Sequence, residues 1–156
     1  MSDFPNGYSR FVYSRWWLLR IIQWRTHSKW GHVEHVLRDG SVVCAWFPGG
    51  VQHWPVGERT DAAAELRCTV ALTDAQVAAG EAFLLAQVGK KYDWFALLGL
   101  FFGANWSSKS QWFCSKLEDG YYKAMGVELV GTLPEPYATP ARLAASSTWT
   151  AKVELP

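Results

Sequence analysis

Short apolar runs separated by turn residues predict β-strands in the first half of the chain. GHVEHVL (31–37) and SVVCAWF (41–47) flank Asp39-Gly40, a dipeptide typical of tight hairpins. VQHWPV (51–56) and ELRCTVAL (65–72) predict two more strands. FVYSRWWLLRIIQWRT (11–26) is rich in aromatic and branched residues and fits either a strand or a short helix that leads into one.

Helical signals follow. Thr73 and Gln76 have the spacing of a capping box, and we expect the helix that they open to end at Gly89. A second helix is expected from near Asp93 through WFALLGLFF, and a third over residues 114–125.

Strands followed by helices favour an α+β domain, with an antiparallel sheet first and helices packed on it afterwards. The length of 156 residues fits a single domain over 1–156. Within it, we expect residues 1–10 to be a flexible lead-in. We expect residues 131–156 to be a loop-rich tail with one short helical piece at PARLAAS.

The amino-acid composition narrows the class of protein. Apolar residues make up 49% of the chain and the formal net charge is +1, which argues against a disordered chain and against a nucleic-acid partner. The ten Trp residues fit either a core or a surface near a ligand or partner. The apolar stretch 94–103 is about half of a membrane span, so we expect a buried helix and no transmembrane segment, with a lipid-facing surface as the alternative.

The N-terminus lacks the order of a secretory signal peptide, which predicts synthesis in the cytoplasm. The three cysteines form no CxxC pair, and their odd number argues against a disulfide framework. No cofactor is expected.

Two residues carry candidate chemistry. Cys114 follows a polar loop at the expected start of a helix, where the helix dipole favours a thiolate. His32 opens a predicted strand and can complete a Cys–His pair. His32 and His35 are an odd number of positions apart, so they point to opposite faces of a strand. This weakens a zinc site built from them and Cys44, and no metal site is expected.

The arrangement of these segments resembles a known family. GHVEHVLRDG followed by SVVCAW is similar to the His-bearing hairpin of NlpC-like papain-fold hydrolases. GKKYDWFALLGLFF and WFCSKLEDGYYKAMG then place a Tyr-Asp pair ahead of a Trp-Phe-Cys-Ser segment. With the hairpin before the Cys helix, this order resembles the circularly permuted papain-like cysteine hydrolases, the YiiX-like branch with its phage-encoded relatives. The resemblance spans roughly residues 12–145.

The resemblance implies that Cys114 is the nucleophile and His32 its base. By the same resemblance, substrate-binding positions are Tyr92, Asp93, Trp112 and Ser115. Relatives usually have Cys-Ser-Glu where this chain has Cys-Ser-Lys, and we expect Lys116 to face solvent.

The third catalytic residue stays open. The position of the orienter in relatives falls on Cys44, and a thiol is a poor hydrogen-bond partner. Glu34, on the same face of the strand as His32, is the alternative, and Gln52 and His53 on the probable next strand are others.

The implied reaction is cleavage of an amide or ester bond through a thioester. We expect a peptide or acyl-amide substrate, with a cell-wall peptide cut by a phage-associated, virion-carried enzyme as the leading hypothesis. One alternative is an inactive structural module of a larger assembly such as a phage tail. Another is a lipid acyltransferase or thioesterase on the same fold.

Overall fold

The computed structural model describes residues 4–58, 62–104, 106–131 and 138–156. A six-stranded antiparallel sheet in the order β4-β3-β2-β1-β5-β6 forms its centre. The strands are β1 (Tyr8–Tyr13), β2 (His32–Val36), β3 (Val42–Trp46), β4 (Gly50–Trp54), β5 (Ala64–Thr69) and β6 (Ala151–Leu155). The α+β class is therefore confirmed.

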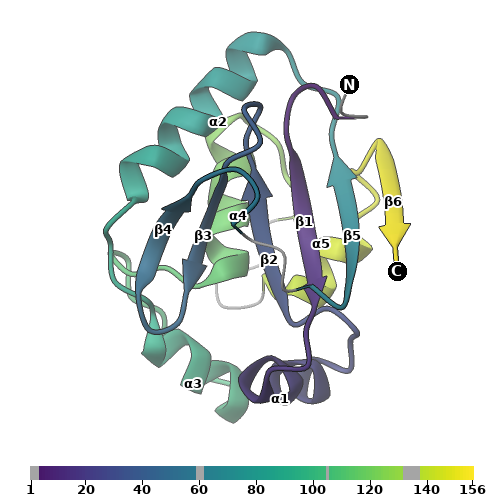
Figure 1. The fold of residues 1–156 in the computed structure, drawn as a ribbon. Helices are drawn as coiled ribbons and strands as arrows, with labels where there is room; N and C mark the ends of the chain where they lie inside the picture. The colour runs from purple at the N-terminus through teal and green to yellow at the C-terminus, as the bar shows by residue number, and fades with distance from the viewer. Residues whose placement is uncertain (1–3, 59–61, 105, 132–137) are drawn as a thin grey trace.

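Helices α2, α4 and α5 lie on one side of the sheet, and α1 and α3 lie together at one end of the molecule (Figure 1). Their bounds are α1 (Trp17–Thr26), α2 (Asp74–Gln87), α3 (Trp94–Phe102), α4 (Cys114–Ala124) and α5 (Pro140–Ala145). Because α4 packs directly on β2 and β3, its N-terminal end is fixed beside the start of β2.

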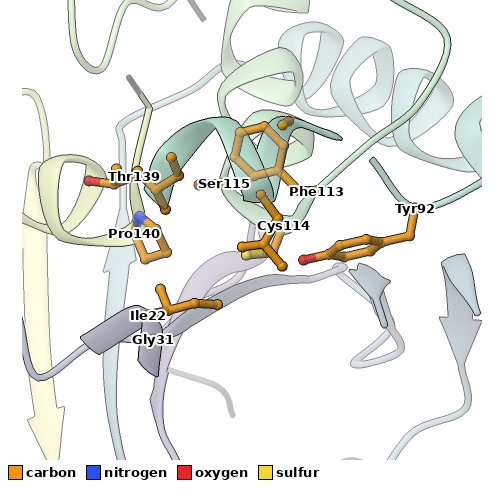
Figure 2. A pocket seen from close by; sticks show the side chains of 11 residues that line it. Ile22, Gly31, Tyr92, Phe113, Cys114, Ser115, Thr139 and Pro140 are labelled. Atoms are coloured by element: carbon orange, nitrogen blue, oxygen red, sulfur yellow. The ribbon is translucent and has the colours of Figure 1, made fainter. Parts of the chain in front are cut away.

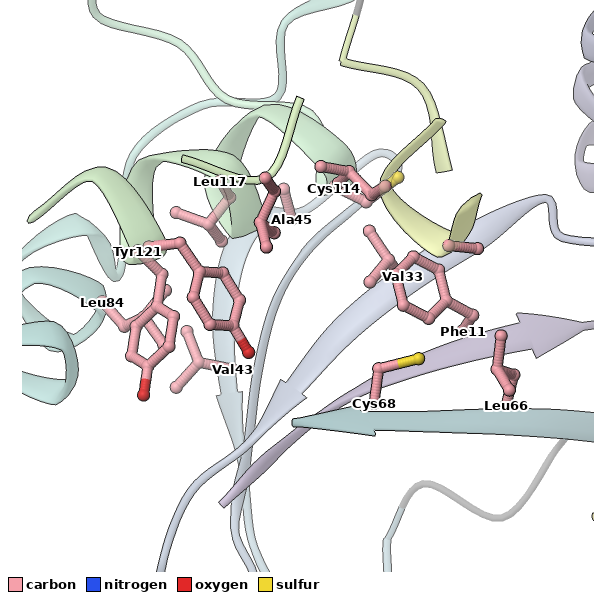
Figure 3. Packing of buried hydrophobic residues seen from close by; sticks show 14 of the residues in the cluster. Phe11, Val33, Val43, Ala45, Leu66, Cys68, Leu84, Cys114, Leu117 and Tyr121 are labelled. Atoms are coloured by element: carbon pink, nitrogen blue, oxygen red, sulfur yellow. The ribbon is translucent and has the colours of Figure 1, made fainter. Parts of the chain in front are cut away.

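The core fills the space between α4 and the sheet. Leu117 and Tyr121 of α4 face Val33 and Val43 of the sheet, with Phe11 beside them (Figure 3). All five side chains are fully buried or nearly so. Burial of a Leu or Phe side chain contributes about 1.5–3 kcal/mol, so this packing holds α4 firmly in place.

Local signals placed several elements correctly. The hairpin between β2 and β3 turns at Gly40, whose φ of 85° suits glycine. Thr73 and Gln76 form the predicted capping box at α2, and Asp93 caps α3 through the backbone N–H of Ala96. The short helical piece at PARLAAS is α5.

Two expectations about the first part of the chain were wrong. Residues 8–10 are not a flexible lead-in, because β1 starts at Tyr8 and is a central strand that pairs with β2 and β5. The polar residues Ser9 and Arg10 interrupt the apolar pattern, so the sequence did not predict this strand from its start. In the structure Ser9 bonds to the buried Glu118, and Arg10 to the buried Glu34. Helices do not simply follow strands, since α1 lies between β1 and β2.

The tail also contains more regular structure than expected, since β6 pairs with β5 at the edge of the sheet. Residues 132–137 of the expected loop lie outside the described part of the chain.

The apolar helix over 94–102 is also not buried as expected. Ala96, Leu97 and Gly99 face inwards, but Phe95 and Phe102 are 63% and 72% exposed. Within the described residues, no helix is long and apolar enough to cross a membrane. The sequence showed how apolar this segment is, but not that one of its sides has no neighbour in the fold.

Candidate active site

Cys114 is the first residue of α4. The preceding residue, Phe113, is the N-cap and makes no side-chain capping hydrogen bond. The first helical hydrogen bond runs from the N–H of Leu117 to the carbonyl of Phe113, so the backbone N–H groups of the first turn are not used within the helix. Together with the helix dipole, they make the surroundings of the Cys114 sulfur electropositive.

His32, the first residue of β2, meets this end of α4. Burial alone lowers the pKa of His32, but the charge and hydrogen bond of Cys114 outweigh burial, and the pKa lies well above 6.5. Burial likewise raises the pKa of Cys114, but His32 and the backbone N–H groups of Val33 and Ser115 lower it below 9.0. The opposite shifts favour the charged forms of both groups, a thiolate on Cys114 and an imidazolium on His32.

Glu34 lies next to His32 on the same face of β2, and its carboxylate Oε2 is 3.6 Å from His32 Nε2. Its other oxygen, Oε1, accepts hydrogen bonds from the guanidinium of Arg10, with Nε at 2.7 Å. Glu34 is 1% exposed. The positive charge of Arg10 favours the negatively charged form of a carboxylate beside it, and such a carboxylate can stabilise a positive charge on the imidazole.

Cys44 of β3 lies on the same face as His32 and Glu34. One ligand atom from each of these three buried residues lies within 4.8 Å of the others. His32 Nε2 is buried and has no hydrogen-bond partner among the described residues. A nitrogen, a thiol sulfur and a carboxylate oxygen fit the preferences of a zinc-type ion. The sequence argument against zinc considered His35, which does point to the other face, and overlooked Glu34.

A narrow, mostly apolar pocket opens beside Cys114. Its cavity volume is about 20 Å³. The Tyr92 ring extends into it with the hydroxyl directed towards Cys114, and Ser115 also lines it (Figure 2). Ile22 of α1 and Leu97 of α3 contribute apolar walls. The pocket therefore lies between the Cys114 thiol and helices α1 and α3 at the end of the molecule.

Lys116 does not face solvent, which corrects the expectation from sequence. Its ammonium lies 3.7 Å from the carboxylate of Asp93 and donates hydrogen bonds to Ser107 Oγ and to the Gln111 carbonyl, both at 3.0 Å. A further bond goes to the carbonyl of Ser108. Lys116 was missed as a site residue because exposed lysines are the rule. The sequence feature that could have indicated a buried Lys116 is Asp93, an isolated acidic residue upstream whose charge requires a basic partner if it is buried.

This ion pair shows why the Tyr-Asp pair accompanies the cysteine segment. The N–H of Asp93 donates to the carbonyl of Trp112 at 2.9 Å, and the N–H of Trp112 donates to the carbonyl of Lys91 at 3.1 Å. These bonds and the Asp93–Lys116 pair fix the loop that leads into Cys114. Asp93, fully buried under this loop, positions the site and does not line the pocket.

The structure does not bring every candidate into the site. The Trp112 ring packs edge-on against Phe83 of α2, with ring centres 5.7 Å apart, and is not among the residues that line the pocket. His53 turns away from His32, and its Nε2 lies 2.8 Å from Ser41 Oγ. Gln52 stands opposite Cys44 in the sheet.

Fold and site together define an α+β protein with a buried cysteine–histidine pair at the start of a helix. The same fold occurs in the crystal structure of the metalloprotein yiiX from Escherichia coli O157:H7, with a TM-score of 0.73, 18% sequence identity and coverage of 96% of both chains. At this identity the likeness concerns the fold alone. No protein-family model and no curated protein sequence matches the chain.

Proposed function

We propose that this protein is a cysteine hydrolase of the circularly permuted papain-like kind, which cleaves an amide or ester through a thioester on Cys114. The observation that carries the proposal is the buried pair of Cys114 and His32, whose pKa values shift in opposite directions towards the charged forms. A thiolate beside an imidazolium is the resting state that nucleophilic thiol catalysis requires.

In the first step the Cys114 thiolate attacks the acyl carbon, and the carbonyl π electrons move to its oxygen. The resulting oxyanion is stabilised by backbone N–H groups of the first turn of α4, among them that of Cys114. The electron pair then reforms the carbonyl, and the bond to the leaving group breaks. The His32 imidazolium gives its proton to the departing amine or alcohol, which leaves a thioester.

In the second step His32, now neutral, takes a proton from water as it attacks the thioester. The tetrahedral intermediate collapses, the C–S bond breaks and the carboxylic acid is released. Cys114 leaves as the thiolate, and the imidazolium is restored. Glu34, held by Arg10, stabilises the charged imidazole in the resting state and again when deacylation restores it. Tyr92 lines the pocket beside Cys114, and in this mechanism it contacts the acyl group.

The substrate class follows from the resemblance and from the pocket. Peptidoglycan peptides remain the leading hypothesis for a phage-associated enzyme. The apolar walls of the pocket favour an acyl chain as the alternative. Incubation with isolated stem peptides and, separately, with N-acyl amides distinguishes the two, because only the true class yields a free amine that depends on Cys114.

The direct test is the pH dependence of Cys114 alkylation by iodoacetamide, read by peptide mass spectrometry. We expect Cys114 to react well below the pH at which a free thiol of pKa roughly 8.5 does, and His32→Ala to remove this advantage. Cys68 is an internal control, because burial raises its pKa to about 12 and keeps it inert.

If Cys114 reacts no faster than a free thiol at any pH, and His32→Ala changes nothing, the catalytic proposal is overturned. The non-catalytic structural module then becomes the better description.

A specific observation favours a second candidate, metal binding by His32, Glu34 and Cys44. The E. coli protein that shares the fold is described as a metalloprotein, and the three residues offer a suitable donor set within 4.8 Å. A zinc-type ion held by these residues would supply a Lewis acid or a structural link. His32 Nε2 would serve as a ligand, so the imidazole could not become the imidazolium that the hydrolase needs.

The two candidates differ in their dependence on Cys44. For a metal protein, we expect one zinc per chain by elemental analysis of protein prepared with zinc, and its loss in Cys44→Ala. For a hydrolase, Cys44→Ala retains the low-pH alkylation of Cys114. Zinc that stays bound in both Cys44→Ala and His32→Ala excludes this cluster as the metal site.

A further inference from the structure

Helices α1 and α3 expose large apolar side chains on their outer sides. On α1, Trp17 and Trp24 are 62% and 73% exposed, with Ile21 between them. Their spacing places them on one face of the helix. On α3 the exposed side chains are Trp94, Phe95, Leu98 and Phe102, and Trp106 follows the helix. Soluble monomers rarely gather so many exposed apolar side chains unless the surface binds something.

The two helices are neighbours. Arg25 Nε of α1 donates to the carbonyl of Phe101 of α3 at 3.5 Å, and Figure 1 shows both helices at the same end of the molecule. Their inner sides, through Ile22 and Leu97, line the pocket that contains Cys114. The exposed apolar side chains, which we call the aromatic face, therefore lie on the outer sides of the same helices that wall the pocket.

The charged residues of the segments that carry the aromatic face are all basic. Segments 11–33 and 94–113 contain no Asp or Glu and contribute Arg15, Arg20, Arg25, Lys29 and Lys109. Of these, Lys29 pairs with Glu154 of β6 at 2.6 Å. Arg20 is exposed on α1 itself. Trp and Phe beside Arg and Lys is the composition of helices that lie in a membrane interface, where rings enter the headgroup region and cations contact anionic lipids.

We propose that the aromatic face docks the protein on the surface of an anionic phospholipid bilayer. The helices have 10 and 9 residues and lie along the surface without crossing the membrane. Docking brings the Cys114 pocket to the level of the lipid headgroups, where the acyl part of a lipid-borne substrate is within reach. Binding itself does not require the chemistry of Cys114.

The test is co-sedimentation of the full chain with vesicles of phosphatidylcholine alone and of phosphatidylcholine with phosphatidylglycerol. We expect binding to the anionic vesicles, weakened by high salt. Trp24→Ser combined with Phe102→Ser should weaken it at least about tenfold, because two rings leave the interface. Arg20→Gln should weaken it about fivefold.

Two control variants separate this proposal from others. Leu85→Ser removes an exposed leucine of α2, away from the aromatic face, and should bind like wild type. Cys114→Ala should also bind like wild type, so failure of the hydrolase proposal leaves this result intact. Circular dichroism establishes that each variant is folded.

Equal partition of all variants, or no binding to anionic vesicles, overturns the proposal. So does a concentration-dependent dimer that Trp24→Ser with Phe102→Ser abolishes, because the aromatic face is then covered by a second copy of the chain.

Discussion

Strand β2 carries two buried histidines with opposite surroundings. His35 faces α4, and its Nδ1 donates to Glu118 Oε1 at 2.9 Å. The same carboxylate accepts a hydrogen bond from Ser9, whose hydroxyl lies 2.8 Å from that of Tyr122. His32 faces the other way, towards the Glu34 carboxylate at 3.6 Å and the sulfur of Cys114.

The difference fits a structural role for His35 and, under the proposed function, a chemical role for His32. The carboxylate beside His35 is engaged on several sides within the core, so this cluster stabilises α4 on the sheet. The Nε2 atom of His32 has no hydrogen-bond partner in the described part of the chain. The imidazole also interacts with the Cys114 thiol, the candidate nucleophile. An imidazole at such a site can gain and lose a proton during a reaction.

The largest effect is expected from breaking the structural cluster. Glu118→Ala leaves His35 and Ser9 buried without their acceptor, which should cost about 3–5 kcal/mol in the free energy of unfolding. Urea denaturation measures it. Glu128→Ala, at an exposed position after α4, is the matched control and should stay within about 0.5 kcal/mol. Equal stability of the two variants would show that the carboxylate has no structural role.

The interaction between Cys114 and His32 should make the free energy of unfolding depend on pH. The lowered pKa of Cys114 contributes stability that is fully present above the pKa of the unfolded thiol and is lost as the pH falls through the folded pKa. The raised pKa of His32 contributes stability that is fully present below pH 6.5 and is lost as the pH rises through the folded pKa of His32. The stability lost in Cys114→Ala, about 1.5–3 kcal/mol, should therefore peak near neutral pH and shrink on both sides.

Cys68→Ala is the control for this pH profile. The Cys68 pKa of about 12 places its titration outside the measured range, so its loss should cost the same at every pH from 5 to about 9. A flat profile for Cys114→Ala as well would mean that no charged pair forms.

A smaller effect tests whether Glu34 supports the charge on His32. Glu34→Gln keeps the shape but removes the negative charge, so the imidazolium loses part of its stabilisation. We expect Cys114 alkylation near pH 7 to slow by up to about tenfold, which corresponds to about one unit in the thiol pKa. Alkylation in urea-unfolded protein is the control and should be identical in both proteins.

The sequence predicted the positions of Cys114 and His32 in the fold better than their surroundings. A cysteine at a helix start and a histidine at a strand start are local signals, and the structure has both. The support from Arg10 and Lys116 was missed, because each becomes visible only when distant segments place a carboxylate beside it. The exposure of α3 was missed for a related reason, since apolar composition does not show which side of a helix the fold leaves uncovered.

The smallest effect concerns the structural side of β2. The Tyr121 ring lies 3.9 Å from that of His35, and its buried hydroxyl has no hydrogen-bond partner among the described residues. Burying an unpaired hydroxyl is unfavourable, so Tyr121→Phe should keep the packing and leave stability equal or raise it by up to about 1 kcal/mol. Tyr122→Phe is the matched variant, and it should destabilise the fold because its hydroxyl contacts Ser9. If Tyr121→Phe costs as much as Tyr122→Phe in urea denaturation, the Tyr121 hydroxyl has a partner such as buried water, and the polar cluster around His35 is larger than its protein contacts.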